Sequence, residues 1–155
     1  GLRGLSLVCN AAYIHSRVRF EEGAPERDRP LAGQSPYLVN AGLFYQHDDK
    51  GISASLLYNR IGKRIESVGV PMQDQNEDIP DIYEMPRNSL DLTFSKKIGK
   101  AVEIKAGIQD MLNSKIEYKQ FVKLTDQNGG KREREQLVRS YRPGVDINVG
   151  VSLKF

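Results

Sequence analysis

The sequence predicts an all-β protein, built from about six strands of an antiparallel up-and-down transmembrane β-barrel. Three observations predict this fold class. The last stretch, 145–155, alternates strictly between apolar and polar residues, and the connections between alternating segments are in turn short and long. No run approaches the roughly eighteen apolar residues that a membrane helix needs. A mean hydropathy of −0.52 suits a barrel, because half of each strand faces its lumen.

The final stretch carries the clearest pattern. Successive side chains of a strand point to opposite sides, so one face holds only apolar residues and the other holds polar residues and glycine. About eleven residues, tilted, cross the hydrocarbon layer in a barrel. The apolar face comprises Val145, Ile147, Val149, Val151, Leu153 and Phe155, and the opposite face comprises Asp146, Asn148, Gly150, Ser152 and Lys154.

The remaining strands are predicted in chain order. Strands are expected over 5–20, 37–45, 52–59, 89–95 and from 102 through Phe121, followed by 137–141 and the final stretch. Short turns are expected at 47–51 and 97–100. Long polar loops are expected at 21–36, 66–86 and 125–135, where prolines, glycines and charges gather.

The connections assign the two ends of the sheet. Outer-membrane barrels have short periplasmic turns and longer outer loops. With Phe155 at the periplasmic edge, both short turns lie on that side and all three long loops lie on the other. The aromatic residues expected near strand ends, as interfacial girdles, are Tyr45, Tyr58, Tyr118, Tyr141 and Phe155.

The alternation also predicts which side chains face lipid. In three well-patterned segments, the apolar face is opposed by polar residues such as Asp91, Glu103 and Lys105, which are expected to pair within the lumen wall. The predicted lipid-facing residues are Leu90, Leu92, Phe94, Val102, Ile104, Ile108, Val145, Ile147, Val149 and Val151.

Two stretches carry a resemblance to known proteins. The ending Asn148-Val-Gly-Val-Ser-Leu-Lys-Phe155 resembles the carboxy-terminal assembly signal of bacterial outer-membrane barrels, with Asn148, Gly150, Leu153 and Phe155 at the matching positions. The hairpin 87–109, running into Gln109-Asp-Met-Leu-Asn113, resembles the end of TonB-dependent receptors. That end carries an Asn/Asp-Leu-Phe/Leu-Asn-like motif, and Met111 departs from it in the motif's second position. The approach 29–37 also resembles a late barrel strand of that family, so the resemblance covers nearly the whole chain.

This resemblance implies a 22-stranded barrel in the bacterial outer membrane, of which the chain would be the carboxy-terminal portion. The parent would hold an amino-terminal plug, contact the TonB system through a segment upstream of Gly1, and import a scarce nutrient. Siderophore, cobalamin, metal and glycan all remain open as its ligand. Because the chain opens directly into strand-like sequence without a signal peptide, we expect an internal start. The implied partners are outer-membrane lipid, the rest of the barrel with its plug, and the barrel assembly machine.

Other chemistry finds little support in the sequence. No nucleophile elbow, catalytic triad or phosphate loop is present, so no enzyme activity and no cofactor are predicted. His15 and His47 lack ligand partners at metal-binding spacing, and Cys9 is the single cysteine, which excludes an intrachain disulfide. The net charge of +3, with both signs interspersed, predicts no nucleic-acid partner.

Two charged segments and two rival folds stay open. The carboxylates of 74–84 are expected to form a solvated loop rather than a cation site, and Lys131-Arg-Glu-Arg-Glu135 an exposed loop rather than a lipopolysaccharide contact. A soluble antiparallel barrel or sandwich that binds a ligand is one alternative. A non-transporting outer-membrane barrel is the other, because it would share the terminal signal.

Overall fold

The computed structural model describes residues 4–21, 28–70, 79–125 and 131–154. These residues form ten antiparallel strands in two sheets, and no helix among them is long and apolar enough to cross a membrane. The strands are β1 (Leu5–Tyr13), β2 (Tyr37–His47), β3 (Ile52–Ile61), β4 (Arg64–Ser67), β5 (Ile82–Glu84), β6 (Arg87–Ile98), β7 (Val102–Gln109), β8 (Ile116–Thr125), β9 (Lys131–Tyr141) and β10 (Asp146–Leu153).

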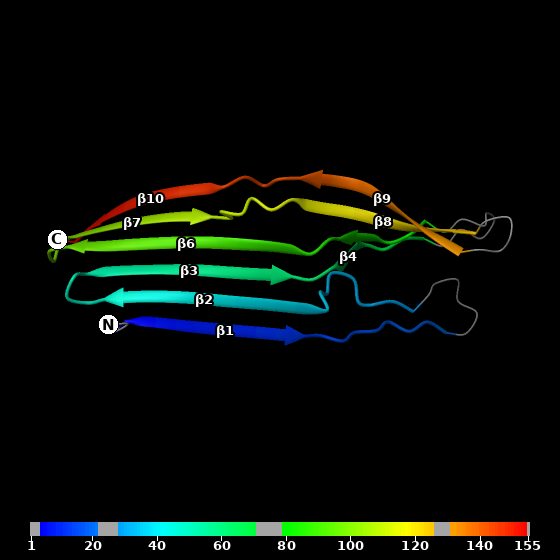
Figure 1. The fold of residues 1–155 in the computed structure, drawn as a ribbon, viewed down its shortest axis with the longest axis horizontal. Coiled ribbons are helices and arrows are strands. Elements are labelled where there is room, and N and C mark those ends of the chain that lie inside the picture. The colour runs from blue at the N-terminus through cyan, green and yellow to red at the C-terminus, as the bar shows by residue number, and fades with distance from the viewer. Residues whose placement is uncertain (1–3, 22–27, 71–78, 126–130, 155) are drawn as a thin grey trace.

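The larger sheet has six strands in the order β1-β2-β3-β6-β7-β10, and the smaller has four in the order β4-β5-β8-β9. The smaller sheet extends the larger one, because β4 follows β3, β5 precedes β6, β8 follows β7 and β9 precedes β10. Figure 1 shows the result as one elongated layer with β1 and β10 along its two long edges. We call the larger sheet the wall and the smaller sheet the outer sheet.

Two tight turns lie at one end of the wall. The β2–β3 turn closes at Gly51 (φ 58°), and the β6–β7 turn contains Gly99 (φ 60°), a backbone region that glycine enters without steric cost. The Gly51 carbonyl also accepts a hydrogen bond from the Lys97 amide at 2.7 Å, which links the two turns. The long connections lie at the opposite end (Figure 1). The two predicted short turns are therefore confirmed.

Three predicted boundaries were wrong. The first strand ends at Tyr13 rather than Phe20, beyond which only an isolated Val18–Arg29 bridge forms. The predicted loops 66–86 and 125–135 contain β5 and the start of β9, together with the end of β4. Pairing with β8 makes β9 a strand, since opposite charges such as Lys119 and Glu135 meet across the ladder at 2.6 Å. Part of each loop, 71–78 and 126–130, lies outside the described residues.

The predicted strand from 102 through Phe121 is interrupted. Asp110 (φ 50°) and Asn113 (φ 43°) both adopt left-handed backbone conformations that end β7. The Asp110 amide donates to the Asp91 carboxylate at 2.8 Å, and the Met111 amide donates to the Leu90 carbonyl at 2.8 Å. Asn113 in turn accepts from Arg142 and Gly144. The segment is thus a fixed corner between the wall and the outer sheet.

The hydrophobic core lies entirely outside the wall. Among the described residues, the buried apolar side chains are Ile65, Ile116 and Tyr118, all from the outer sheet. The wall is a single layer without a second sheet or helix against either face (Figure 1). A sheet with no core of its own must bury its apolar side chains against something else to be stable.

Candidate functional site

The strand register joins the apolar side chains of the wall into one continuous face. Residues paired across antiparallel strands project to the same side of a sheet. One row therefore crosses all six strands without a polar residue. It runs through Leu7, Leu43, Leu56, Leu92, Ile108 and Ile147.

This apolar face is open to its surroundings. Leu7 is 68% exposed, Ile147 is 71% exposed and Val149 is 72% exposed. A contiguous apolar surface of this extent on a water-exposed protein marks a contact with another apolar phase or partner. The face is therefore the principal candidate functional surface.

The apolar face runs obliquely to the strands. Val149 of β10 lies directly across the sheet from Tyr45 of β2. In β2 the apolar residues of this face end at Tyr45, because His47 is the next residue on the same face. In β10 they continue beyond Val149 to Leu153. The boundary of the apolar face therefore shifts by about 14 Å along the strand, from residue 149 to residue 153. This shift occurs between β2 and β10, which are separated by strand spacings that sum to about 19 Å. The boundary is therefore inclined by about 35° to the sheet's cross-strand direction.

The opposite boundary shifts in the same sense. The apolar set of β2 begins at Tyr37, whereas that of β7 stops at Ile108, which lies directly across from Leu43. Beyond Ile108 the chain turns at Asp110. The apolar face is therefore an inclined band rather than a rectangle, and its boundary near the short turns has the inclination of about 35–45° that strands take in membrane barrels.

The reverse side of the wall, which we call the inner face, is largely polar. Ser53 and Ser95 hydrogen-bond at 2.7 Å, and the Asn59 amide donates to the Asn40 carbonyl oxygen. The predicted pairing of lumen-face charges is confirmed for Lys105, whose ammonium lies 3.3 Å from Glu103. Cross-strand polar pairs of this kind stabilise a sheet face that contacts water or polar groups.

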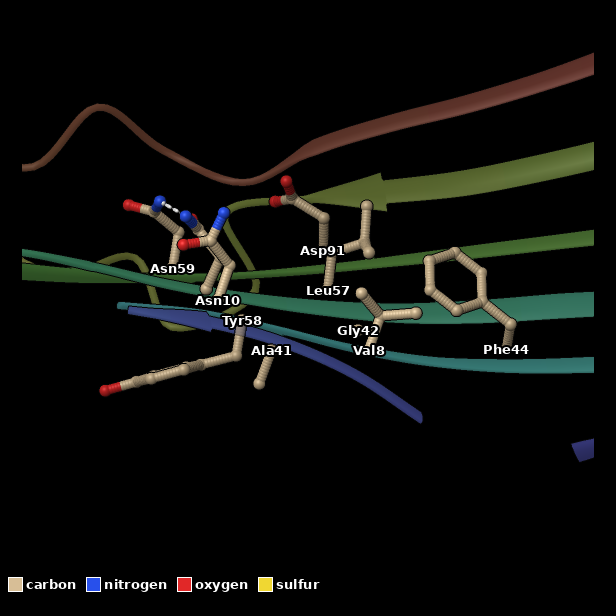
Figure 2. A pocket seen from close by; sticks show the side chains of 10 residues that line it. Val8, Asn10, Ala41, Gly42, Phe44, Leu57, Tyr58, Asn59 and Asp91 are labelled. Atoms are coloured by element: carbon tan, nitrogen blue, oxygen red, sulfur yellow. Dashed lines mark hydrogen bonds between the residues drawn. The ribbon is translucent and has the colours of Figure 1, made fainter. Parts of the chain in front are cut away.

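The inner face contains a hollow that the sequence pattern did not reveal. It has a volume of about 300 Å³, and the polar side chains Asn10, Asn40, Asn59 and Asp91 line it together with Val8, Phe44 and Leu57. Figure 2 shows Tyr58 and Ala41 projecting to the opposite side of the sheet from Asn59, Asp91 and Phe44. The inner face is therefore not uniformly polar. A Cβ on Gly42 would lie 2.7 Å from the Phe44 ring, so the glycine makes room for that ring.

The predicted assembly-signal residues lie on both faces of β10. Leu153 is on the apolar face, whereas Asn148 and Gly150 are on the inner face, opposite Gly107 and Lys105. A Cβ placed on Gly107 would lie 2.7 Å from the Asn148 Oδ1 atom, so the missing side chain makes room for Asn148. Phe155 lies outside the described residues.

The predicted lipid-facing residues within strands share one face of the wall. The ladders place Leu90, Leu92, Phe94, Val102, Ile104, Ile108, Ile147, Val149 and Val151 there, and Val145 precedes β10. Their common placement follows from the register. That the phase they meet is lipid stays a prediction.

The outer sheet holds its charged side chains in pairs. Both Nε and Nη2 of Arg64 donate to one Glu84 oxygen, at 2.9 and 2.7 Å, and Glu84 is buried. The Lys63 ammonium lies 3.6 Å from the ring centre of Phe121 and 4.1 Å from that of Tyr83. Burial lowers the pKa of Lys63, and nearby carboxylates oppose that shift. These contacts stabilise the folded structure of the outer sheet.

The described part of the chain contains no candidate metal site. No group of three His, Cys, Asp or Glu side chains there could hold an ion. Asp81, one of the carboxylates singled out in the sequence, accepts a hydrogen bond from the Gly69 amide at 2.8 Å, and Glu84 pairs with Arg64. Cys9 is a free, exposed cysteine on β1.

No family model matches the chain, and neither a curated protein nor a solved structure matches it. The TonB-dependent receptor resemblance therefore rests on the residues quoted for it.

Proposed function

We propose that this chain forms part of the lipid-facing wall of a transmembrane β-barrel in the bacterial outer membrane. The inclined, exposed apolar band carries this proposal. A water-soluble sandwich would bury the same side chains against a second sheet, whereas a barrel presents them outward as a band about 25 Å tall, crossed by tilted strands. At about 3.3 Å per residue, β2, β3 and β6, which have 11, 10 and 12 residues, are long enough for that crossing even when tilted.

The open edges point the same way. β1 and β10 each have a neighbour on one side only, and a hydrocarbon phase does not tolerate the unpaired backbone groups of a free edge. Six strands are also fewer than the roughly eight that close the smallest barrels. In the proposed barrel, further strands of a longer chain cover both edges.

We further propose that the parent is a TonB-dependent receptor that imports a nutrient, with the short turns in the periplasm and the outer sheet outside the cell. The support is the resemblance of 87–113 and of the terminal signal, together with the placement of both short turns at one end. In this reading the inner face meets the plug, and the chain itself performs no catalysis. The non-transporting barrel is the rival that lacks a plug and a TonB contact.

Cys9 offers a direct test of the membrane assignment. In the full-length protein reconstituted in phospholipid vesicles, with any other cysteines replaced, a fluorophore on Cys9 should be quenched by lipids spin-labelled on their acyl chains. The matched control is Asn10→Cys in a Cys9→Ser background, because the neighbouring side chain lies on the inner face. Equal quenching at both positions would count against a lipid-facing band.

The transport assignment has its own test. The full-length protein should be captured by the purified periplasmic domain of TonB, and the capture should be lost when the segment that contacts TonB is deleted. A protein that passes the quenching test but shows no TonB contact would be a non-transporting barrel.

A further inference from the structure

One charged side chain interrupts the apolar band at the end with the short turns. Lys96 lies on the apolar face of β6, between Phe94 and Ile98 along the strand. Its cross-strand partners are Ile52 of β3 and Ile104 of β7. A lysine surrounded on four sides by apolar residues contradicts the pattern that the rest of the band follows.

The ammonium group of Lys96 reaches toward the turn. Its Nζ atom donates a hydrogen bond to the Lys50 carbonyl in the β2–β3 turn. The alkyl stem therefore stays on the apolar face while the charge lies at the rim. Long basic side chains adopt this arrangement near an apolar boundary, because the stem can be buried while the charge remains solvated.

Lysines at this end of the wall have no carboxylate partners among the described residues. None of Lys50, Lys96, Lys97, Lys100 and Lys154 forms an ion pair there, although Asp48 and Asp49 lie in the same turn as Lys50. At the other end, basic side chains such as Arg64, Lys119 and Arg139 each face a carboxylate. The lysine ammonium groups at the short-turn rim therefore form no ion pair with the described carboxylates.

We propose that Lys96, supported by Lys50, binds the phosphate of an anionic phospholipid in the leaflet that surrounds the short-turn rim. This inference rests on the proposed membrane insertion. The partner is identified by two complementary features, because the apolar neighbours Ile52, Ile98 and Ile104 pack against acyl chains while the ammonium donates hydrogen bonds to the headgroup phosphate. A soluble anion would match the charge alone.

The adjacent residue supplies a matched control. Lys97 lies at the same depth and carries the same charge, but it projects to the inner face, where Glu103 is its cross-strand neighbour in the ladder. Lipid outside a barrel does not reach that face. Lys96→Gln and Lys97→Gln therefore remove the same charge from opposite sides of one strand.

The experiment measures binding of phosphatidylglycerol to the full-length protein in detergent micelles by native mass spectrometry. Removing one lysine near an anionic headgroup should weaken the tightest phosphatidylglycerol binding about five-fold. We expect this loss for Lys96→Gln, no change for Lys97→Gln, and near-native binding for Lys96→Arg. Phosphatidylcholine with the same acyl chains and free inorganic phosphate should show no dependence on Lys96.

Equal weakening by Lys96→Gln and Lys97→Gln, or competition by inorganic phosphate as strong as by the lipid, would overturn the inference. Folding of each variant is checked by its altered electrophoretic mobility before and after heating. A protein that inserts into vesicles but shows no Lys96-dependent selectivity refutes only this headgroup site. A protein that does not insert refutes the proposed function itself.

Discussion

Replacing Val149 by arginine separates a lipid-facing wall from a water-facing one. Val149 is the middle of the apolar run from Ile147 to Leu153 in β10, and it is 72% exposed. In water, a substitution at so exposed a position changes the free energy of unfolding by no more than about 0.5 kcal/mol. At the midplane of a bilayer, arginine on the lipid face of a barrel costs about 2–4 kcal/mol. That range is about a 30- to 900-fold change in the folding equilibrium.

The assay is reversible urea unfolding of the full-length protein in phospholipid vesicles, with three variants compared under one condition. Val149→Arg should show the full loss of stability. Leu153→Arg, near the short-turn end of the same run, should lose only about 0–1 kcal/mol because the charge can reach the interface. Ser152→Arg projects to the inner face and should stay within about 0.5 kcal/mol of the unsubstituted protein.

The order of the three variants is the decisive result. If Val149→Arg is no more costly than Ser152→Arg, the band does not meet lipid and the barrel assignment is wrong. If Val149→Arg and Leu153→Arg are equally costly, the band is buried against protein rather than spanned by a bilayer, since depth dependence is a property of the membrane.

Three further predictions test other parts of the molecule. Deleting Phe155 from the full-length protein should lower its amount at the cell surface, measured by surface labelling; unchanged levels would contradict the assembly-signal assignment. Gly107→Ala should cost about 1 kcal/mol in urea unfolding, because its Cβ would meet Asn148, and this cost should vanish in an Asn148→Ala background. Glu84→Gln should weaken the contact with Arg64 by about 1–2 kcal/mol and speed amide hydrogen exchange in β5. Lipid quenching at Cys9 should stay unchanged, and altered quenching would mean that the wall and the outer sheet are coupled.

The sequence predicted the wall well because the physics that builds it is local. Alternation with a period of two fixes which side of the strand each residue takes, and glycine at the two tight turns fixes where the chain reverses. Apolar residues of the alternating segments, such as Leu92, Ile108 and Ile147, could therefore be assigned to one face before any strand pairing was known. The register then aligned them across strands, which no single strand could specify.

The outer sheet was missed because its strands are defined by their partners. The segment 131–136 has no apolar alternation, and it becomes part of β9 through cross-strand charge pairs with β8. The break after Gln109 was missed for a related reason. It depends on left-handed backbone at Asp110 and Asn113 and on a hydrogen bond to Asp91, which lies 19 residues earlier in the chain.

Lys96 shows how a departure from a pattern can carry information that the pattern lacks. The alternation alone would treat it as an error in an otherwise apolar face. In the structure the Lys96 side chain points toward the β2–β3 turn, where its ammonium reaches the carbonyl of Lys50.

The wall and the outer sheet solve the problem of stability in different ways. The outer sheet has a small buried core at Ile65, Ile116 and Tyr118, and its charged side chains are paired, as expected of structure surrounded by water. Among the described residues the wall has no fully buried apolar side chain and no second layer, so its apolar face gains little burial from the protein itself. In the proposed barrel, lipid supplies that burial, and the change of surroundings falls where the chain passes from wall to outer sheet, at the Gly62–Lys63 link and the Asp110–Asn113 corner. A single aqueous environment would leave unexplained why the strands that share a continuous apolar face are the ones without a core.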